Sequence, residues 1–276
     1  MLSTVENMFR RSRRALSGTN PTVDGIVSTA VGYYARSWVR AASLRNGMRY
    51  DAPIDPARLY EVDPQEIERT LSWTEITTDR KADDHPRFRP PKYKLAGQVF
   101  DGPWDLHTDP LTESTILQSF RAHFQRGVPW VKTDFYAETR AAIESGATLW
   151  DCRSKADLEK RCAELDRLFE RIADDGYLTQ TELRERGESR ISPHRLDRVI
   201  WGEIAVSVGR DGQLLFLDGR NRLAMARVQG LDSVPVVILV RHENWQRRRD
   251  RVARGELTRE DLPERARDHP DLVDLL

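Results

Sequence analysis

The residues best suited to chemistry form one short run, Asp218-Gly219-Arg220-Asn221-Arg222. This run follows an apolar stretch, Leu214 to Leu217, which predicts a strand, and it precedes a pattern that predicts a short helix. Glycine allows positive φ and a close approach of the backbone to a bulky anion. Unpaired amides at a helix N-terminus and arginine side chains both bind phosphate. The run therefore predicts an anion-binding turn in which Gly219, Arg220 and Arg222 hold a phosphate.

Structural roles fit the same residues, so the alternatives stay open. Asp218 can cap the helix, or it can bind Mg²⁺ or accept a proton from a substrate hydroxyl. Glu203 enters the first strand of the preceding hairpin and could face the same cleft as a second catalytic carboxylate. Gln180 can hydrogen-bond a base or ribose, or stabilise a turn. His242, at the end of a later strand, is either a titrating group or an ordinary exposed histidine.

The elements that would position this turn are helices followed by strands. Helices are predicted from Ser114 to Gly127, from an Asp134 cap to Gly146, and from a Ser154 cap to Gly176. The alternation of Ile204, Val206 and Val208 predicts one strand, Arg210-Asp211-Gly212 marks a hairpin turn, and Pro235 to Val240 predicts a third strand. The fold class expected is α+β, with a helical and irregular N-terminal region and a small mixed sheet.

Two blocks of the sequence resemble the ParB/sulfiredoxin superfamily, which includes the ParB N-terminal domain and the free-serine kinases. The first block is Leu168 to Gln180, similar to the helix that leads into the family's G-L-x-Q motif. The second is Leu217 to Val236, similar to its G-E-R-R-x-R-A and D-G-H-H-R motifs, with Gly230 and a Val-Pro strand in the expected order. About 75 of the 276 residues are covered.

The resemblance implies a nucleotide-binding domain whose second block holds phosphate in a turn lined by Gly219, Arg220, Asn221 and Arg222. The cofactor expected is a nucleoside di- or triphosphate (ATP, ADP or CTP) with Mg²⁺, bound by Gln180 and the turn, with Asp218 as metal ligand. The function expected is kinase-like phosphotransfer to a small hydroxyl-bearing or glycan-type acceptor. The alternative is a non-catalytic nucleotide switch, or a ParB-like protein that binds nucleic acid or a membrane surface.

Departures from the family pattern exclude some of its chemistry. Sulfiredoxin needs a cysteine in this turn, where Arg220 and Asn221 stand, so sulfinic acid reduction is excluded. The kinases usually carry histidine at the position of Asn221, which puts their chemistry in doubt. DNA partition is also disfavoured, because the 34 residues after His242 are too few for a helix-turn-helix module.

Composition divides the chain into four expected regions: a basic segment 1–50, a helical and irregular region 51–164, the family-like domain 165–245 and a charged helical tail 246–276. The first segment has eight arginines against Glu6 and Asp24, and its apolar residues step by three and four from Ile26 to Ala42. Such a helix could lie on an anionic membrane or touch nucleic acid, or it could bury Tyr34 and Trp38 while its arginines face water.

The remaining bulk properties are those of a cytoplasmic protein. Acidic and basic residues balance at 44 each, so net charge predicts no partner. Cys152 and Cys162 fit no metal motif and no disulfide framework, and Cys162, on the apolar stripe of a predicted helix, is expected as a buried reduced thiol. The stretch from Gly25 to Leu44 is interrupted by arginines, so no membrane-spanning helix is expected.

Overall fold

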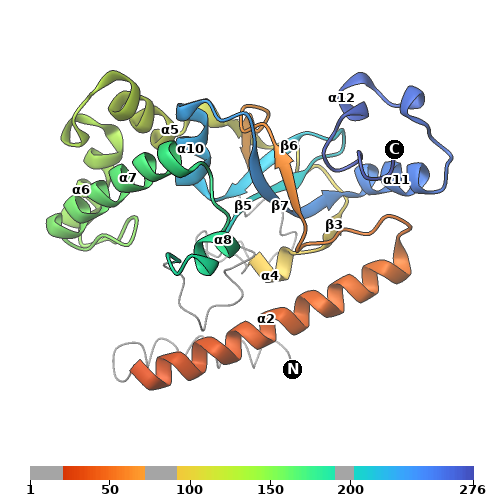
Figure 1. The fold of residues 1–276 in the computed structure, drawn as a ribbon, viewed down its shortest axis with the longest axis horizontal. Helices are drawn as coiled ribbons and strands as arrows, with labels where there is room; N and C mark the ends of the chain where they lie inside the picture. Colours follow the sequence, from red (N-terminus) through yellow and green to blue (C-terminus); the bar gives the residue numbers. More distant parts are fainter. Residues whose placement is uncertain (1–20, 72–91, 190–201) are drawn as a thin grey trace.

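The computed structural model describes residues 21–71, 92–189 and 202–276. Within these ranges the chain is α+β, with helices arranged around a mixed seven-stranded sheet, which confirms the predicted fold class (Figure 1). The strands are β1 (Leu59–Val62), β2 (Arg69–Leu71), β3 (Gln98–Phe100), β4 (Thr108–Pro110), β5 (Ile204–Val208), β6 (Leu214–Asp218) and β7 (Val234–His242).

The centre of the sheet is formed by the strands after residue 203. Strand order is β1-β7-β5-β6-β2-β4, and β3 pairs with β7. β5 and β6 form the predicted antiparallel hairpin, while β5 runs parallel to β7 and β2 runs parallel to β6. β1 pairs with the first half of β7 and β3 with the second half. One sheet thus joins strands on both sides of the expected boundary at residue 164.

Helices cover the sheet and extend beyond it. The α-helices are α2 (Pro21–Arg49), α4 (Lys92–Leu95), α5 (Thr115–Phe120), α6 (Asp134–Glu144), α7 (Lys155–Asp175), α8 (Gln180–Glu185), α10 (Arg220–Gln229), α11 (Glu243–Ala253) and α12 (Glu264–Arg267). Short 3₁₀ turns span Leu111–Glu113, Trp130–Lys132 and Arg259–Asp261, and a π-helical turn spans Arg121–Gln125.

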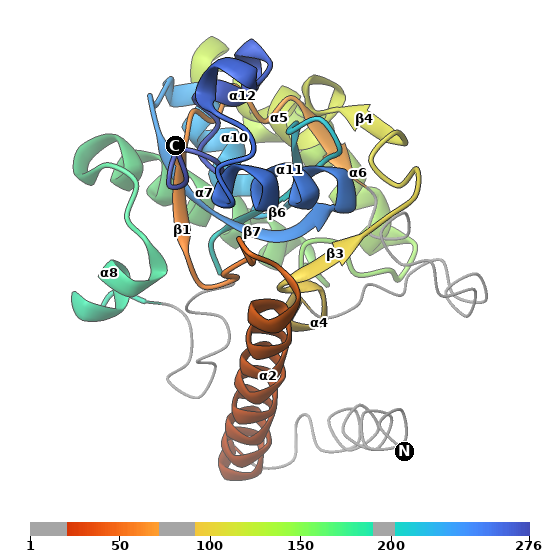
Figure 2. The ribbon, with the colours of Figure 1, turned by 90° about the vertical axis from the view of Figure 1, so that its right-hand side faces the viewer.

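Both faces of the central sheet are buried. On one face, Val206 and Phe216 pack in a core with α5, α7 and α10; on the other, Leu215 and Val237 pack with Ala35 of α2 and Leu95 of α4. Figures 1 and 2 show α2 along the outside of this second face. Strands covered on both faces are apolar throughout. The strand expected from Ile204, Val206 and Val208 is confirmed as β5, and all of its residues are buried.

The described part of the region 51–110 contains four short strands. Besides β1, the three-residue strands β2, β3 and β4 belong to the sheet, and irregular segments lie between them. Three residues are too few for a visible alternation in the sequence. Residues 72–91 lie outside the described ranges.

The helix ends follow their capping residues closely. Ser154 Oγ accepts from the Asp157 amide at 3.1 Å, and Gly176 ends α7 as predicted. The expected Asp134 cap is wrong by one residue, because Thr133 accepts from the Tyr136 amide instead. Cys152 and Cys162 are buried free thiols, as expected of Cys162. No helix in the described ranges is both long and apolar enough to cross a bilayer.

Candidate functional site

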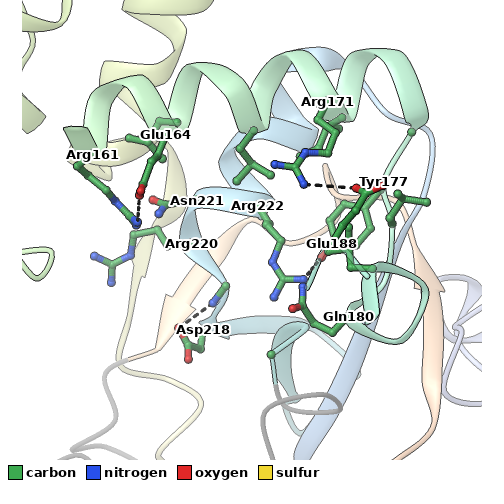
Figure 3. A pocket seen from close by; sticks show the side chains of 18 of the residues that line it. Arg161, Glu164, Arg171, Tyr177, Gln180, Glu188, Asp218, Arg220, Asn221 and Arg222 are labelled. Atoms are coloured by element: carbon green, nitrogen blue, oxygen red, sulfur yellow. Dashed lines mark hydrogen bonds and ion pairs between the residues drawn. The ribbon is translucent and has the colours of Figure 1, made fainter. Parts of the chain in front are cut away.

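A cavity of about 430 Å³ opens where α7, α8 and the start of α10 meet; we call it the turn cavity. Its floor is the segment from Asp218 to Arg222, and α7 forms one wall (Figure 3). The apolar part of the lining comprises Trp150, Leu165, Leu168, Ile172, Leu178 and Leu183. The volume lies within the range of small-molecule sites, which combine an apolar lining with a few polar groups.

Gly219 makes the turn between β6 and α10 possible. Its φ is 93° and its ψ 25°, a left-handed conformation that favours glycine. A Cβ atom at this position would lie 2.8 Å from the Ile204 Cα, so the backbone of β5 leaves no room for a side chain. The predicted Asp218 cap is wrong: Gly219 is the N-cap of α10, and the Asp218 carboxylate accepts from the Gly219 amide at 2.8 Å.

The N-terminus of α10 meets the turn cavity without a side-chain cap from any described residue. Its first turn has no acidic residue but carries Arg220 and Arg222. Cations are unfavourable at the positive end of a helix dipole, by a few tenths of a kcal/mol to about 1 kcal/mol each. The local charge is therefore arranged for an anion rather than for the stability of the isolated helix.

Arg222 is held by a buried network behind the turn cavity. Its Nη1 donates to the Glu203 carboxylate at 2.8 Å and to the Tyr177 hydroxyl at 3.0 Å. The same carboxylate accepts from the Tyr177 hydroxyl at 3.3 Å and from the Gln180 amide. The network joins the two sequence blocks, Leu168 to Gln180 and Leu217 to Val236, at one place in the fold.

Burial governs the ionisation of this network. It raises the pKa of Glu203, an effect that the Arg222 guanidinium opposes. It raises the pKa of the Tyr177 hydroxyl strongly, so this phenol remains protonated and donates. Burial alone would lower the pKa of Arg222, but its contacts with Tyr177 and Glu203 outweigh burial and raise it. We therefore treat Arg222 as a fixed charge at one end of the cavity.

The predicted site residues divide into two groups. Asp218, the four residues of the turn and the Gln180 side chain all line the cavity (Figure 3). Glu203 is only 1% exposed and sits behind Arg222, outside the described lining. A substrate in the cavity would meet Arg222 first, so the geometry makes Glu203 a positioning residue. His242 is not exposed but buried at the start of α11.

Two arginines that the sequence motifs did not predict also reach the cavity. Arg161 and Arg171 extend from α7, each with a loose acidic partner: Glu164 at 3.9 Å and Glu188 at 3.7 Å (Figure 3). They follow the same face of α7 as Leu165, Leu168 and Ile172, a spacing that could have indicated them once the cavity face was known. Four arginines thus converge on the cavity.

Asn221 supplies an unsatisfied group at the same place. Its Oδ1 atom is buried and has no hydrogen-bond partner among the described residues. Buried polar atoms are nearly always paired. Asn221 therefore has an acceptor atom at the cavity for which the described chain supplies no donor.

Trp150 forms the boundary between the turn cavity and a second cavity. The Arg220 guanidinium lies over its indole ring, 5.6 Å from the centroid. Trp150 and Asp151 have φ values of 57° and 61°, a conformation that is strained for residues other than glycine. Nothing in the sequence around Trp150 signals this turn. The second cavity, about 450 Å³, shares Trp150 and Arg220 and is lined by the carboxylates of Asp109, Glu113 and Glu138 and by Ser114 and Thr115.

No preformed metal centre accompanies these cavities. In the ranges 21–71, 92–189 and 202–276, no group of three or more His, Cys, Asp or Glu side chains is placed to hold a metal ion. Asp218 alone could contribute a ligand beside the turn, with the remaining ligands coming from phosphate and water.

Comparison with family models, with curated proteins and with solved structures finds no match for this chain. The ParB/sulfiredoxin resemblance therefore stays a prediction, and the chemistry must be argued from the cavity itself.

Proposed function

We propose that the protein binds a nucleoside di- or triphosphate (ATP, ADP or CTP) in the turn cavity. The observation that carries this proposal is the convergence of the uncapped α10 N-terminus and four arginines on one cavity of small-ligand size. The phosphates would lie against the amides of the first turn of α10 and against Arg220. The apolar wall of α7, with Leu168 and Ile172, would receive the base.

The charge arrangement supports an anionic ligand. Arg220 and Arg222 sit at the positive end of the α10 dipole, where they repel it and each other. Glu203 compensates Arg222 from behind, while Arg161, Arg171 and Arg220 line the cavity together with the carboxylates of Glu164, Glu188 and Asp218. A phosphate group would relieve the repulsion and gain charge-assisted hydrogen bonds.

The second cavity supports phosphotransfer to a small acceptor. It adjoins the turn cavity across the pair Trp150 and Arg220, and its carboxylates and hydroxyls suit a hydroxyl-bearing or glycan-type molecule. The acceptor oxygen would form a bond to the terminal phosphorus as the bond to the nucleotide breaks. Asp218 is the carboxylate placed either to take the acceptor's proton or to hold Mg²⁺, which would neutralise phosphate charge.

A non-catalytic nucleotide switch is the second candidate. It is favoured by the commitment of the Glu203 carboxylate to three donors, which keeps one of the two predicted catalytic groups away from reactants. Transfer of the terminal phosphate to a panel of polyols and sugars would support the enzyme. Tight binding of one nucleotide without turnover would support the switch.

The binding proposal is tested by calorimetric titration with ATP, ADP, CTP and GTP, each with Mg²⁺. A matched pair of variants on α7 makes the test specific: Arg161→Ala removes a cavity arginine, and Arg167→Ala removes an exposed arginine of the same helix outside the described lining. We expect Arg161→Ala to weaken binding about tenfold or more and Arg167→Ala to leave it unchanged. Equal affinities in both variants, or no binding by the wild-type protein, would contradict the proposal.

A further inference from the structure

The long helix α2 has two faces with different surroundings. Its inner face is buried: Ala35 and Ala42 are 0% and 4% exposed, and the buried Asn46 side chain donates to the Gly97 carbonyl. Arg45 also contacts the Gln98 side chain at 3.3 Å, and Lys94 lies over the Trp38 ring. These contacts with α4 and β3 hold the C-terminal half of α2 against the sheet, so its opposite face has a fixed direction.

That opposite face carries an exposed stripe made of Tyr33, Arg40, Leu44 and Met48. The residues are spaced by seven, four and four, which places them along one side of an α-helix. Tyr33, Leu44 and Met48 are 63%, 72% and 84% exposed, among the most exposed large apolar side chains of the described residues. Figure 2 shows α2 projecting from the body of the protein, away from α11 and α12. Exposed apolar stripes of this kind mark contact surfaces.

The charge around the outer stripe selects the kind of partner. Arg40 lies in the stripe and Arg36 beside it, whereas Arg45 and Arg49 lie nearer the inner face; the sequence has no acidic residue from 25 to 50. A second copy of so basic a helix would repel the first, which disfavours self-association through this face. Leu44 and Met48 suit acyl chains better than a nucleic-acid groove, where exposed aromatic and polar groups do most of the contact.

We propose that α2 docks the protein on an anionic lipid bilayer, with the outer stripe at the level of the headgroups and Arg36 and Arg40 on lipid phosphates. Helices with an apolar stripe and basic flanks lie in the plane of the interface in this way. The proposal goes beyond nucleotide binding and is independent of it, because α2 contributes no residue to the turn cavity lining.

Sedimentation of the full chain with vesicles tests the docking surface. The vesicles are phosphatidylcholine alone and phosphatidylcholine mixed with phosphatidylserine, each with and without high salt. The variant Leu44→Glu/Met48→Glu places two acids on the outer stripe. Its matched control, Leu106→Glu/Val131→Glu, makes the same chemical change at two positions that are 58% and 59% exposed elsewhere.

We expect binding to the anionic vesicles, a fall in partitioning of about tenfold or more in the α2 variant, and no change in the control. Arg40→Gln should weaken binding less and lower its salt dependence. Absence of wild-type binding, equal binding to neutral vesicles, or equal losses in both double variants would overturn the proposal. Binding to duplex DNA that survives Leu44→Glu/Met48→Glu, without vesicle binding, would assign the arginines to nucleic acid instead.

Discussion

Two strand-to-helix junctions in this fold are built alike but completed differently. β7 runs into α11 at His242, and β6 runs into α10 at Gly219. At the first junction, His242 Nδ1 accepts from the Asn244 amide at 3.1 Å, and its Nε2 donates to the Gly102 carbonyl at 2.9 Å. Glu243 adds a negative charge to the first turn of α11. The chain itself satisfies this helix end.

At the second junction the N-cap residue has no capping side chain and the first turn of α10 has no acid; the nearest carboxylate, Asp218, accepts from the Gly219 amide. Gly219 has no side chain that could cap the helix, as His242 caps α11. The first turn of α10 carries Arg220 and Arg222 where α11 carries Glu243, and it opens onto the turn cavity. A helix N-terminus serves stability when a side chain of the protein accepts from its backbone amides. It is suited to bind an anionic ligand when no side chain does so. Buried ionic contacts do not distinguish the two junctions, because both regions contain them.

The largest effect should come from Arg222→Ala, next to the α10 junction. It leaves the Glu203 carboxylate buried without its cationic partner, so we expect a loss of about 3 kcal/mol in the free energy of unfolding. Urea denaturation measures this loss. Arg220→Ala, two residues earlier and partly exposed, should cost less than about 1 kcal/mol. Similar losses in the two variants would mean that the network around Glu203 does not stabilise the fold.

A fall in pH should have the next largest effect on stability, through protonation of His269 near α11. Its Nε2 donates to the Gly212 carbonyl and its Nδ1 accepts from the Asp271 amide, so the folded ring is neutral. Burial lowers the pKa of His269 to about 4. The unfolded chain takes up this proton near pH 6.5, so His269 contributes fully above that pH and loses its contribution as pH falls toward 4.

The expected loss over this window is about 3 kcal/mol, measured by urea denaturation at a series of pH values. His269→Gln, which cannot take up the proton, should flatten that part of the profile. A slope that stays the same in His269→Gln would show that other groups titrate in this window.

Substitutions at the two N-caps should separate stability from binding. His242→Ala removes the cap of α11 and a buried ring that stacks on Trp104, at a cost of about 2 kcal/mol. We expect nucleotide affinity to be unchanged in the folded fraction. Gly219→Ala meets the Ile204 backbone and should cost about 1–3 kcal/mol, with a loss of nucleotide affinity as well. Thermal denaturation measures the stability of both variants, and calorimetry measures their nucleotide affinity. A loss of affinity in His242→Ala would show that the two helix ends do not differ in nucleotide binding.

The smallest effects should come from reversing the charges of the first turns. Glu243→Arg opposes the α11 dipole and breaks the 3.1 Å contact with Arg247, so we expect a loss of about 0.5–1 kcal/mol and normal nucleotide binding. Arg220→Glu should change stability little, because a better helix end offsets the lost contact with Trp150. Binding should nevertheless disappear. Retained binding in Arg220→Glu would place the phosphates away from α10.

The sequence predicted those helices and strands whose ends are marked by capping or turn residues. The Ser154 cap and Gly176 bound α7, and the Asp-Gly step correctly placed the end of β6 and the start of α10. The three-residue strands β2 and β4 were not predictable, because three residues that pair only through the fold leave no periodic pattern.

The site was predictable only in part, for a similar reason. The turn residues are contiguous, and their types alone indicate an anion site. The commitment of Arg222 to Glu203 and Tyr177 depends on contacts 19 and 45 residues away in the chain. The position of Trp150 depends on a left-handed turn that tryptophan rarely adopts. Such contacts arise from packing and not from local propensity.

The most direct test of the central claim is amide chemical-shift mapping on the labelled protein. On titration with the nucleotide that calorimetry selects, the account predicts large shifts at the backbone amides of Arg220, Asn221 and Arg222, the open first turn of α10. The amides of Asn244 and Trp245, in the first turn of α11, should stay in place. Binding that shifts neither set, or shifts both equally, would contradict a phosphate site at the N-terminus of α10.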